Sequence, residues 1–92
     1  MSELSIPEWH AQFVRQARWT QGVRNQLYRR AQLLRATRVL DVGCGTGAIT
    51  HELAQRTRGN VTGLDHNRDM IRFAQEHDAA ARYEWGDALQ LP

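Results

Sequence analysis

The 92-residue sequence contains no lysine, and it has one cysteine and two prolines. The single cysteine, Cys44, excludes an internal disulfide and a cysteine-based metal cluster. No apolar run approaches the length of a membrane span, and the N-terminus lacks the apolar centre of a signal peptide. We therefore expect a cytoplasmic protein that does not enter the membrane.

All twelve basic residues are arginines, and they are unevenly distributed. Met1–Arg38 carries a net charge of +5, whereas Val39–Pro92 carries −3. A basic segment can meet RNA, an anionic substrate or an acidic partner, although its plainer interpretation is a solvated helix face. The hydrophobic content of 41% is enough for one small folded domain.

The stretch from Arg38 to Gly47 reads R-V-L-D-V-G-C-G-T-G. Its apolar first half is typical of a buried parallel strand. Its three glycines stand at every second position, where they can continue neither a strand nor a helix, so the chain must turn and expose its backbone to a ligand. Helical spacing resumes at Ala48. This strand–turn–helix unit predicts a nucleotide-type binding fold with its ligand at the strand's carboxyl end.

The rest of the chain predicts an α/β fold. Two helices occupy a first segment, residues 1–37, and a β-α-β-α-β unit with a parallel sheet occupies residues 38–92, which together make an incomplete Rossmann-like three-layer sandwich. The expected helices are about 5–19 (with a capping box at Ser5 and Glu8), 23–34, 48–56 and a last one capped by Asn67, and the expected strands begin at Arg38, Val61 and Arg82.

Each predicted strand ends near an acidic residue: Asp41, Asp65 and Asp87. Because parallel strands have their carboxyl ends at one edge of the sheet, these three side chains are expected to converge on one crevice.

Three motifs resemble those of class I S-adenosylmethionine-dependent methyltransferases. D-V-G-C-G-T-G at Asp41–Gly47 resembles the family's first motif, and L-D-H-N-R-D-M-I at Leu64–Ile71 resembles its second. G-D-A-L-Q-L-P at Gly86–Pro92 resembles its adenine-side segment. The motifs follow the family's order and spacing, and they span the chain from Arg38 to its last residue.

The resemblance implies S-adenosyl-L-methionine as the cofactor and a role for each site residue. Asp41 faces the ammonium group, Asp65 accepts hydrogen bonds from the ribose hydroxyls, and Asp87 with the Ala88 backbone N–H binds adenine. The remaining expected contacts are the turn residues Gly43, Cys44, Gly45 and Gly47 and, beside the adenine ring, His66 and Met70.

Several alternatives stay open. The glycine turn also satisfies a dinucleotide pattern, but Asp41 would repel a pyrophosphate, and that pattern explains neither Asp41 nor Asp87. Asp65 could instead cap a helix, Met70 could be a core residue, and His66 could be exposed and inert. His10, His51 and His77 lack metal-ligand spacing and are expected at the surface or its boundary, and Trp9, Phe13 and Trp19 are expected to pack rather than bind.

The sequence supplies the cofactor half of such an enzyme. The family's acceptor-binding segments, which follow its fourth strand, are absent, so we expect a truncated domain with weak or no turnover by itself and name no catalytic residue. We expect a small-molecule methyl acceptor whose identity the sequence does not specify. A non-catalytic cofactor-binding module is the alternative, and the exposed edge of the first strand could support self-association.

Overall fold

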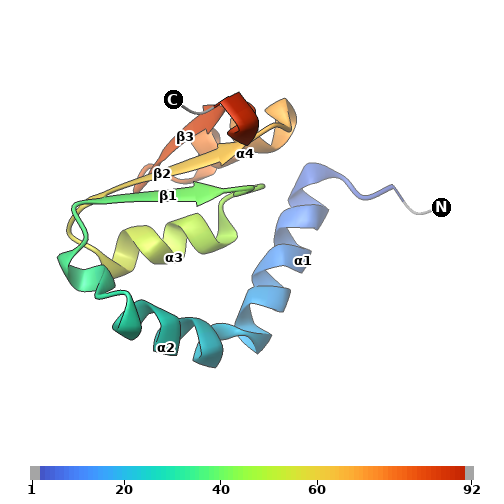
Figure 1. Cartoon of the computed structure of the whole chain (residues 1–92). Coiled ribbons are helices and arrows are strands. Elements are labelled where there is room, and N and C mark those ends of the chain that lie inside the picture. Colours follow the sequence, from blue (N-terminus) through green and yellow to red (C-terminus); the bar gives the residue numbers. More distant parts are fainter. Residues whose placement is uncertain (1–2, 91–92) are drawn as a thin grey trace.

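The computed structural model of the chain describes residues 3–90 (Figure 1). Two helices lead into an alternation of strands and helices, as the sequence predicts. The elements are α1 (Ile6–Trp19), α2 (Gln21–Arg30), the 3₁₀ turn η1 (Leu33–Arg35), β1 (Arg38–Val42), α3 (Ala48–Arg56), β2 (Asn60–Asp65), α4 (Arg68–His77), β3 (Arg82–Trp85) and the 3₁₀ turn η2 (Ala88–Gln90).

The three strands form one parallel sheet in the order β1-β2-β3. Asp41 of β1 lies opposite Gly63 of β2, and Asp65 of β2 lies opposite Trp85 of β3. The carboxyl ends of all three strands therefore meet at one edge. The predicted α/β class and parallel sheet are confirmed.

The first helix begins where its sequence predicts. The Ser5 hydroxyl accepts a hydrogen bond from the Glu8 backbone N–H at 3.3 Å, and the Glu8 carboxylate accepts one from the Ser5 N–H at 3.0 Å. This capping box satisfies two donors that helix geometry leaves without partners. Thr20 alone separates α1 from α2, so Gly22 lies inside a helix rather than in the predicted break.

The prediction that the second helix reaches Leu34 is wrong. It ends at Arg30, and Gln32 takes a left-handed conformation with φ 55° before η1. This reversal buries Leu33, which is 8% exposed, and leaves Leu34 74% exposed. Leu33 packs against Leu53 of α3 and Val61 of β2. The helix therefore ends early where Leu33 becomes buried against residues that are distant in the sequence.

The helices cover one face of the sheet. Leu53 of α3 packs on Val61, and Ala74 of α4 packs on Tyr83, so both core clusters lie on the same side of the strands. Figure 1 shows α3 beneath the sheet, α2 below α3, and α1 at the right, beside the carboxyl end of β1. On the opposite face, Leu40 and Val42 of β1 are 49% and 51% exposed. The sandwich is thus incomplete, as predicted: within residues 3–90 its second face has no long helix.

No helix within the described range is long and apolar enough to cross a bilayer. The cytoplasmic location stays a prediction of the sequence.

Candidate cofactor site at the carboxyl edge of the sheet

The glycine turn after β1 adopts a backbone that glycine favours. Gly43, Gly45 and Gly47 have φ angles of 75°, 57° and 92°, in the left-handed region that costs other residues about 1–2 kcal/mol each. A Cβ on Gly47 would overlap the Tyr83 hydroxyl, whereas a Cβ on Gly43 would meet nothing within 4 Å. The turn therefore packs tightly at its helix end and presents bare backbone at its strand end.

The backbone amides of this turn already have partners within the protein. The N–H groups of Gly43 and Cys44 both donate to the Leu64 carbonyl, at 2.7 and 3.0 Å. The Gly45 N–H donates to Asp65 Oδ2 at 2.8 Å, and the Gly47 N–H donates to the Cys44 carbonyl at 3.0 Å. Dinucleotide sites aim such amides at a pyrophosphate. Four of the amides in this turn are committed elsewhere.

Asp65 fastens the glycine turn of β1 to the end of β2. Its Oδ2 accepts the Gly45 amide, and its Oδ1 accepts the Asn67 amide at 2.8 Å. The alternative interpretation, that Asp65 only caps α4, is not what the structure shows, because the Asn67 side chain accepts the first amides of that helix, from Asp69 and Met70. Each carboxylate oxygen has more than one acceptor site, so Asp65 can still receive hydroxyl donors.

Asp41 is held from the side of α3. The hydroxyl of Thr50, a fully buried residue, donates to Asp41 Oδ2 at 2.6 Å. Burial raises the pKa of Asp41 above its ordinary value; the Thr50 hydrogen bond opposes this rise, and the charge of Asp65 adds to it. The carboxylate therefore lies in an environment where a cationic ligand group would favour its charged form.

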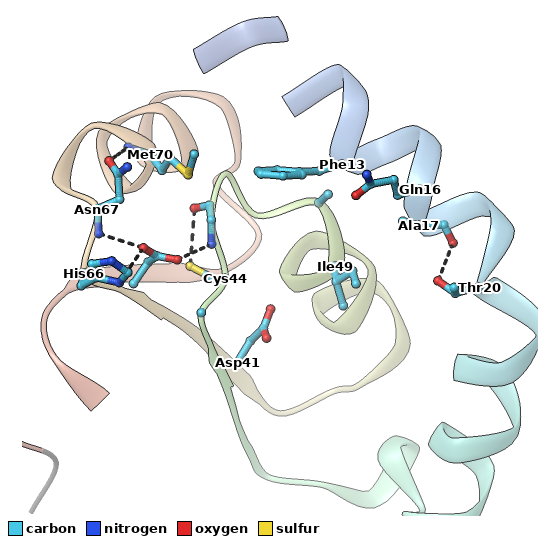
Figure 2. A pocket seen from close by; sticks show the side chains of 14 residues that line it. Phe13, Gln16, Ala17, Thr20, Asp41, Cys44, Ile49, His66, Asn67 and Met70 are labelled. Carbon is cyan, nitrogen blue, oxygen red and sulfur yellow. Dashed lines mark hydrogen bonds and ion pairs between the residues drawn. The ribbon is translucent and has the colours of Figure 1, made fainter. Parts of the chain in front are cut away.

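A cavity of about 600 Å³ lies between this turn and α1 (Figure 2). Most of the predicted site residues line it, and the cavity brings together Asp41, Gly43, Cys44, Gly45, Asp65, His66 and Met70. None of its fourteen lining residues is an arginine, although the chain has twelve. The cavity thus has acidic residues at its floor and no arginine among its lining residues.

A second, smaller cavity of about 310 Å³ adjoins the ends of β2 and β3. It is lined by Asp87 and Ala88 together with Gly43, Asp65 and His66, so Asp65 belongs to both cavities. The Asp87 carboxylate accepts the Leu89 amide at 2.9 Å. The three acidic residues therefore share the carboxyl edge of the sheet, with Asp65 between the other two. Gly47 lines neither cavity.

The other predicted contacts differ in character. The His66 side chain is 90% exposed, so it lies at the rim. Met70 is half-buried, with its sulfur 3.8 Å from the place where a Cβ on Gly45 would be. Burial, together with the charges of Asp41 and Asp65, raises the pKa of Cys44 to about 12, which leaves its thiol protonated and a poor nucleophile at neutral pH.

The residues that the sequence predicted for the site include none from α1, which contributes one wall of the cavity. Phe13, Gln16, Ala17 and Thr20 all line the larger cavity, as do Ala48, Ile49 and Asn67. Figure 2 shows the Phe13 ring over the glycine turn, and a ring carbon lies 3.3 Å from the Cβ position of Gly45. Phe13 also contacts Trp9, at 5.6 Å between ring centroids. Its helical spacing predicted packing, and nothing in that spacing distinguishes a core aromatic from one that also lines a cavity.

Comparison with known proteins agrees with the motifs. A family model described as a methyltransferase domain matches residues 33–92. The chain is 48% identical over 54 residues to a malonyl-[acyl-carrier protein] O-methyltransferase of Pectobacterium atrosepticum, covering 59% of this chain and 21% of the relative. It is 40% identical over 63 residues to a trans-aconitate 2-methyltransferase of Delftia acidovorans, covering 67% and 24%. The chain thus spans about a fifth to a quarter of these relatives.

A solved structure shares both fold and sequence. A TehB-like S-adenosylmethionine-dependent methyltransferase from Corynebacterium glutamicum superposes with a TM-score of 0.54 at 28% identity, covering 88% of this chain and 46% of that one. The predicted family and the cofactor that this family uses are confirmed. With the family model matching more than half of its residues, the chain belongs to the methyltransferase domain family, the S-adenosylmethionine-dependent class that its glycine turn and strand-end acids indicate.

Proposed function

We propose that this chain is the S-adenosylmethionine-binding portion of a methyltransferase that acts on a small molecule. One observation carries the proposal: an arginine-free cavity holds Asp41 and Asp65 beside a glycine turn in which four backbone amides already donate to protein groups. Such a site suits a ligand that is cationic and has no phosphate. S-adenosylmethionine carries an ammonium and a sulfonium, whereas a dinucleotide carries a pyrophosphate that needs donors.

The residues of the two cavities fit the parts of this cofactor. Asp41 lies where it can balance the ammonium group, and Asp65, between the two cavities, can accept the ribose hydroxyls. Asp87 and the Ala88 amide in the smaller cavity suit the adenine ring, with His66 and Met70 on its flanks. The bare backbone at Gly43 lets the ligand approach closely.

The chemistry of methyl transfer asks mainly for positioning. The bound cofactor supplies an electrophilic methyl group, and the reaction is a direct displacement that requires no covalent enzyme intermediate. The chain's own residues contribute by fixing the cofactor's orientation and by excluding water, for which Phe13 and Ile49 supply apolar walls.

The methyl acceptor is proposed to carry a carboxylate. Two relatives that are at least 40% identical are named for malonyl-[acyl-carrier protein] and for trans-aconitate, and the malonyl and trans-aconitate groups both carry a carboxylate. The chain can be incubated with methyl-labelled S-adenosylmethionine and a panel of carboxylic acids, amines and phenols. The label should then appear in base-labile methyl esters of the carboxylic acids, even at low turnover. Base-stable product would contradict this acceptor class.

A thermal-shift comparison tests the cofactor. S-adenosylhomocysteine at about 100 times its Kd should stabilise the chain by about 2.7 kcal/mol, which raises the melting temperature by roughly 11–22 °C in a domain of this size. NAD at the same concentration should give no shift. Stabilisation by NAD alone would favour the dinucleotide alternative, and stabilisation by neither ligand would contradict the proposal.

Two further expectations stay predictions. Self-association through the edge of β1 would appear as a stable dimer in sedimentation, and it would favour the non-catalytic module. A cytoplasmic location remains the expectation for the intact protein.

A further inference from the structure

His10 in the N-terminal half of α1 is near enough to two other histidines, His77 of α4 and His51 of α3, for their charges to act on it. His10 of α1 shares a hydrogen bond with the hydroxyl of Thr46, at 2.7 Å between Nδ1 and Oγ1. Thr46 belongs to the glycine turn and is only 2% exposed. This contact joins residues 36 positions apart, and it connects α1 directly to the loop that forms the cavity floor.

The ring of Phe73 lies between two of these histidines. Its centroid is 5.1 Å from that of His10 and 3.9 Å from that of His77, which stacks on it. The titratable groups whose charges lower the pKa of His10 are His77 of α4 and His51 of α3. Asp78, which follows α4, pairs with His51 at 3.0 Å, so its negative charge lies beside the His51 ring. A proton on His10 would therefore enter a partly buried, aromatic site beside two other imidazoles.

The two ends of α1 are attached differently. Near its C-terminal end, Arg24 donates to the Ala17 carbonyl at 2.7 Å and to the Glu52 carboxylate at 2.9 Å. The hydrogen bond between His10 and Thr46 joins the N-terminal half of α1 to the glycine turn. Phe13 follows His10 by three positions, so both side chains lie on the same face of the helix. His10 and Phe13 therefore approach the glycine turn from the same side of α1.

We propose that His10 is a positioning residue whose neutral imidazole, bonded to Thr46, holds α1 and Phe13 closed over the cofactor cavity. The proposal rests on the proposed function, because it assigns α1 as the wall of that site. Burial lowers the pKa of His10, and the charges of His77 and His51 lower it further. His10 therefore binds a proton less readily when α1 is docked on the glycine turn than when α1 is undocked. Docking is fully favoured above the ordinary histidine pKa of about 6.5, and it weakens as the pH falls below that value.

Calorimetric binding of S-adenosylhomocysteine to the full chain between pH 5.5 and 7.5 tests the consequence. The affinity of the unaltered chain should fall severalfold on acidification, because the docking of α1 over the cavity weakens. His10→Gln, which keeps a group able to bond Thr46, should bind within about twofold of the unaltered chain at pH 7.5 and lose most of the pH dependence. Arg15→Gln, on the exposed face of α1, should behave as the unaltered chain does.

Hydrogen exchange without any ligand separates this proposal from the proposed function. Protection factors of α1 amides should fall between pH 7.5 and 5.5 in the unaltered chain, fall less in His10→Gln, and be low at both pH values in His10→Ala. Equal α1 protection in all three proteins would overturn the positioning role, whether or not S-adenosylhomocysteine binds. An unchanged pH dependence of binding in His10→Gln would overturn it as well. Absence of binding at pH 7.5, with pH-dependent protection of α1 intact, would refute the cofactor assignment alone.

Discussion

Two cavities of similar size lie at different ends of the fold, and their charges are opposite. The cavity at the carboxyl edge, about 600 Å³, is lined by acidic residues and no arginine. The other, about 490 Å³, lies among α2, η1 and the end of α3; it is lined by Arg29, Arg35 and Arg56 and by no acidic residue. The chain's net charge of +2 describes neither. The ligand class of a site therefore follows from its local charge and donor geometry.

The separation of acidic and basic residues between the two cavities has a structural origin. The acidic residues of the first cavity stand at strand ends, where a parallel sheet gathers them. The arginines of the second belong mostly to α2 and the turn after it, and Arg56 is held there by a hydrogen bond to Asn25 at 2.9 Å. Four variants, ordered from the largest expected effect to the smallest, test whether the two regions act independently.

Gly47→Ala should have the largest effect, because the acidic cavity depends on a turn that glycine favours. The left-handed backbone costs about 1–2 kcal/mol and the overlap with Tyr83 about 1–3 kcal/mol more. We expect urea unfolding to show a loss of roughly 3 kcal/mol in the free energy of unfolding. Gly22→Ala, in α2 with open space around it, is the control and should gain up to about 1 kcal/mol. Equal stabilities for the two variants would contradict the role given to the turn.

Asp65→Ala should abolish most cofactor binding. A hydrogen bond to a charged group is worth about 1.5–3 kcal/mol, so the affinity for S-adenosylhomocysteine should fall about 10- to 100-fold in calorimetry. Asp65→Asn keeps the size of the side chain but turns one acceptor into a donor. Its affinity for S-adenosylhomocysteine should lie between those of the unaltered chain and Asp65→Ala. Glu76→Gln on the exposed side of α4 is the control. Binding by Asp65→Ala within twofold of the unaltered chain would remove this residue from the site.

Asp41→Asn should separate stability from binding. Because burial raises the pKa of Asp41, its charged form costs stability at neutral pH, and the neutral amide should raise the melting temperature of the ligand-free chain. This gain should shrink as the pH falls through the raised pKa and disappear below 3.8, where the carboxyl becomes protonated in the folded and the unfolded state alike. Affinity for the cofactor should meanwhile drop about fivefold, the equivalent of about 1 kcal/mol. A variant that loses stability and gains affinity would reverse this assignment.

Replacing both Arg29 and Arg35 by glutamine should have the smallest effect on the cofactor. Both line the basic cavity, and neither lines the acidic ones. The affinity for S-adenosylhomocysteine should change less than about twofold, as for surface substitutions generally. A tenfold loss would show that the two cavities are coupled.

Much of the fold follows from local patterns. The helix over Ala48–Arg56 and the strand over Arg82–Trp85 are predicted at their observed bounds, and the capping box of Ser5 and Glu8 forms as expected. These features depend on residues within a few positions of one another. The convergence of Asp41, Asp65 and Asp87 also follows, because any parallel sheet in this order places strand ends together.

Other features depend on contacts that local spacing does not contain. The end of α2 at Arg30 goes with the left-handed turn at Gln32 and the burial of Leu33 against distant residues. The wall formed by Phe13 depends on how α1 crosses the glycine turn. His10, expected only at a boundary, meets Thr46 of that same turn.

The sequence by itself determined the family and its cofactor, because a glycine turn and acids at strand ends are local signals that a parallel sheet brings together. Tertiary structure decided which residues close the site and where the arginines gather. Those outcomes depend on packing between segments far apart in the chain. The free energy of that packing cannot be inferred from any short stretch of the sequence.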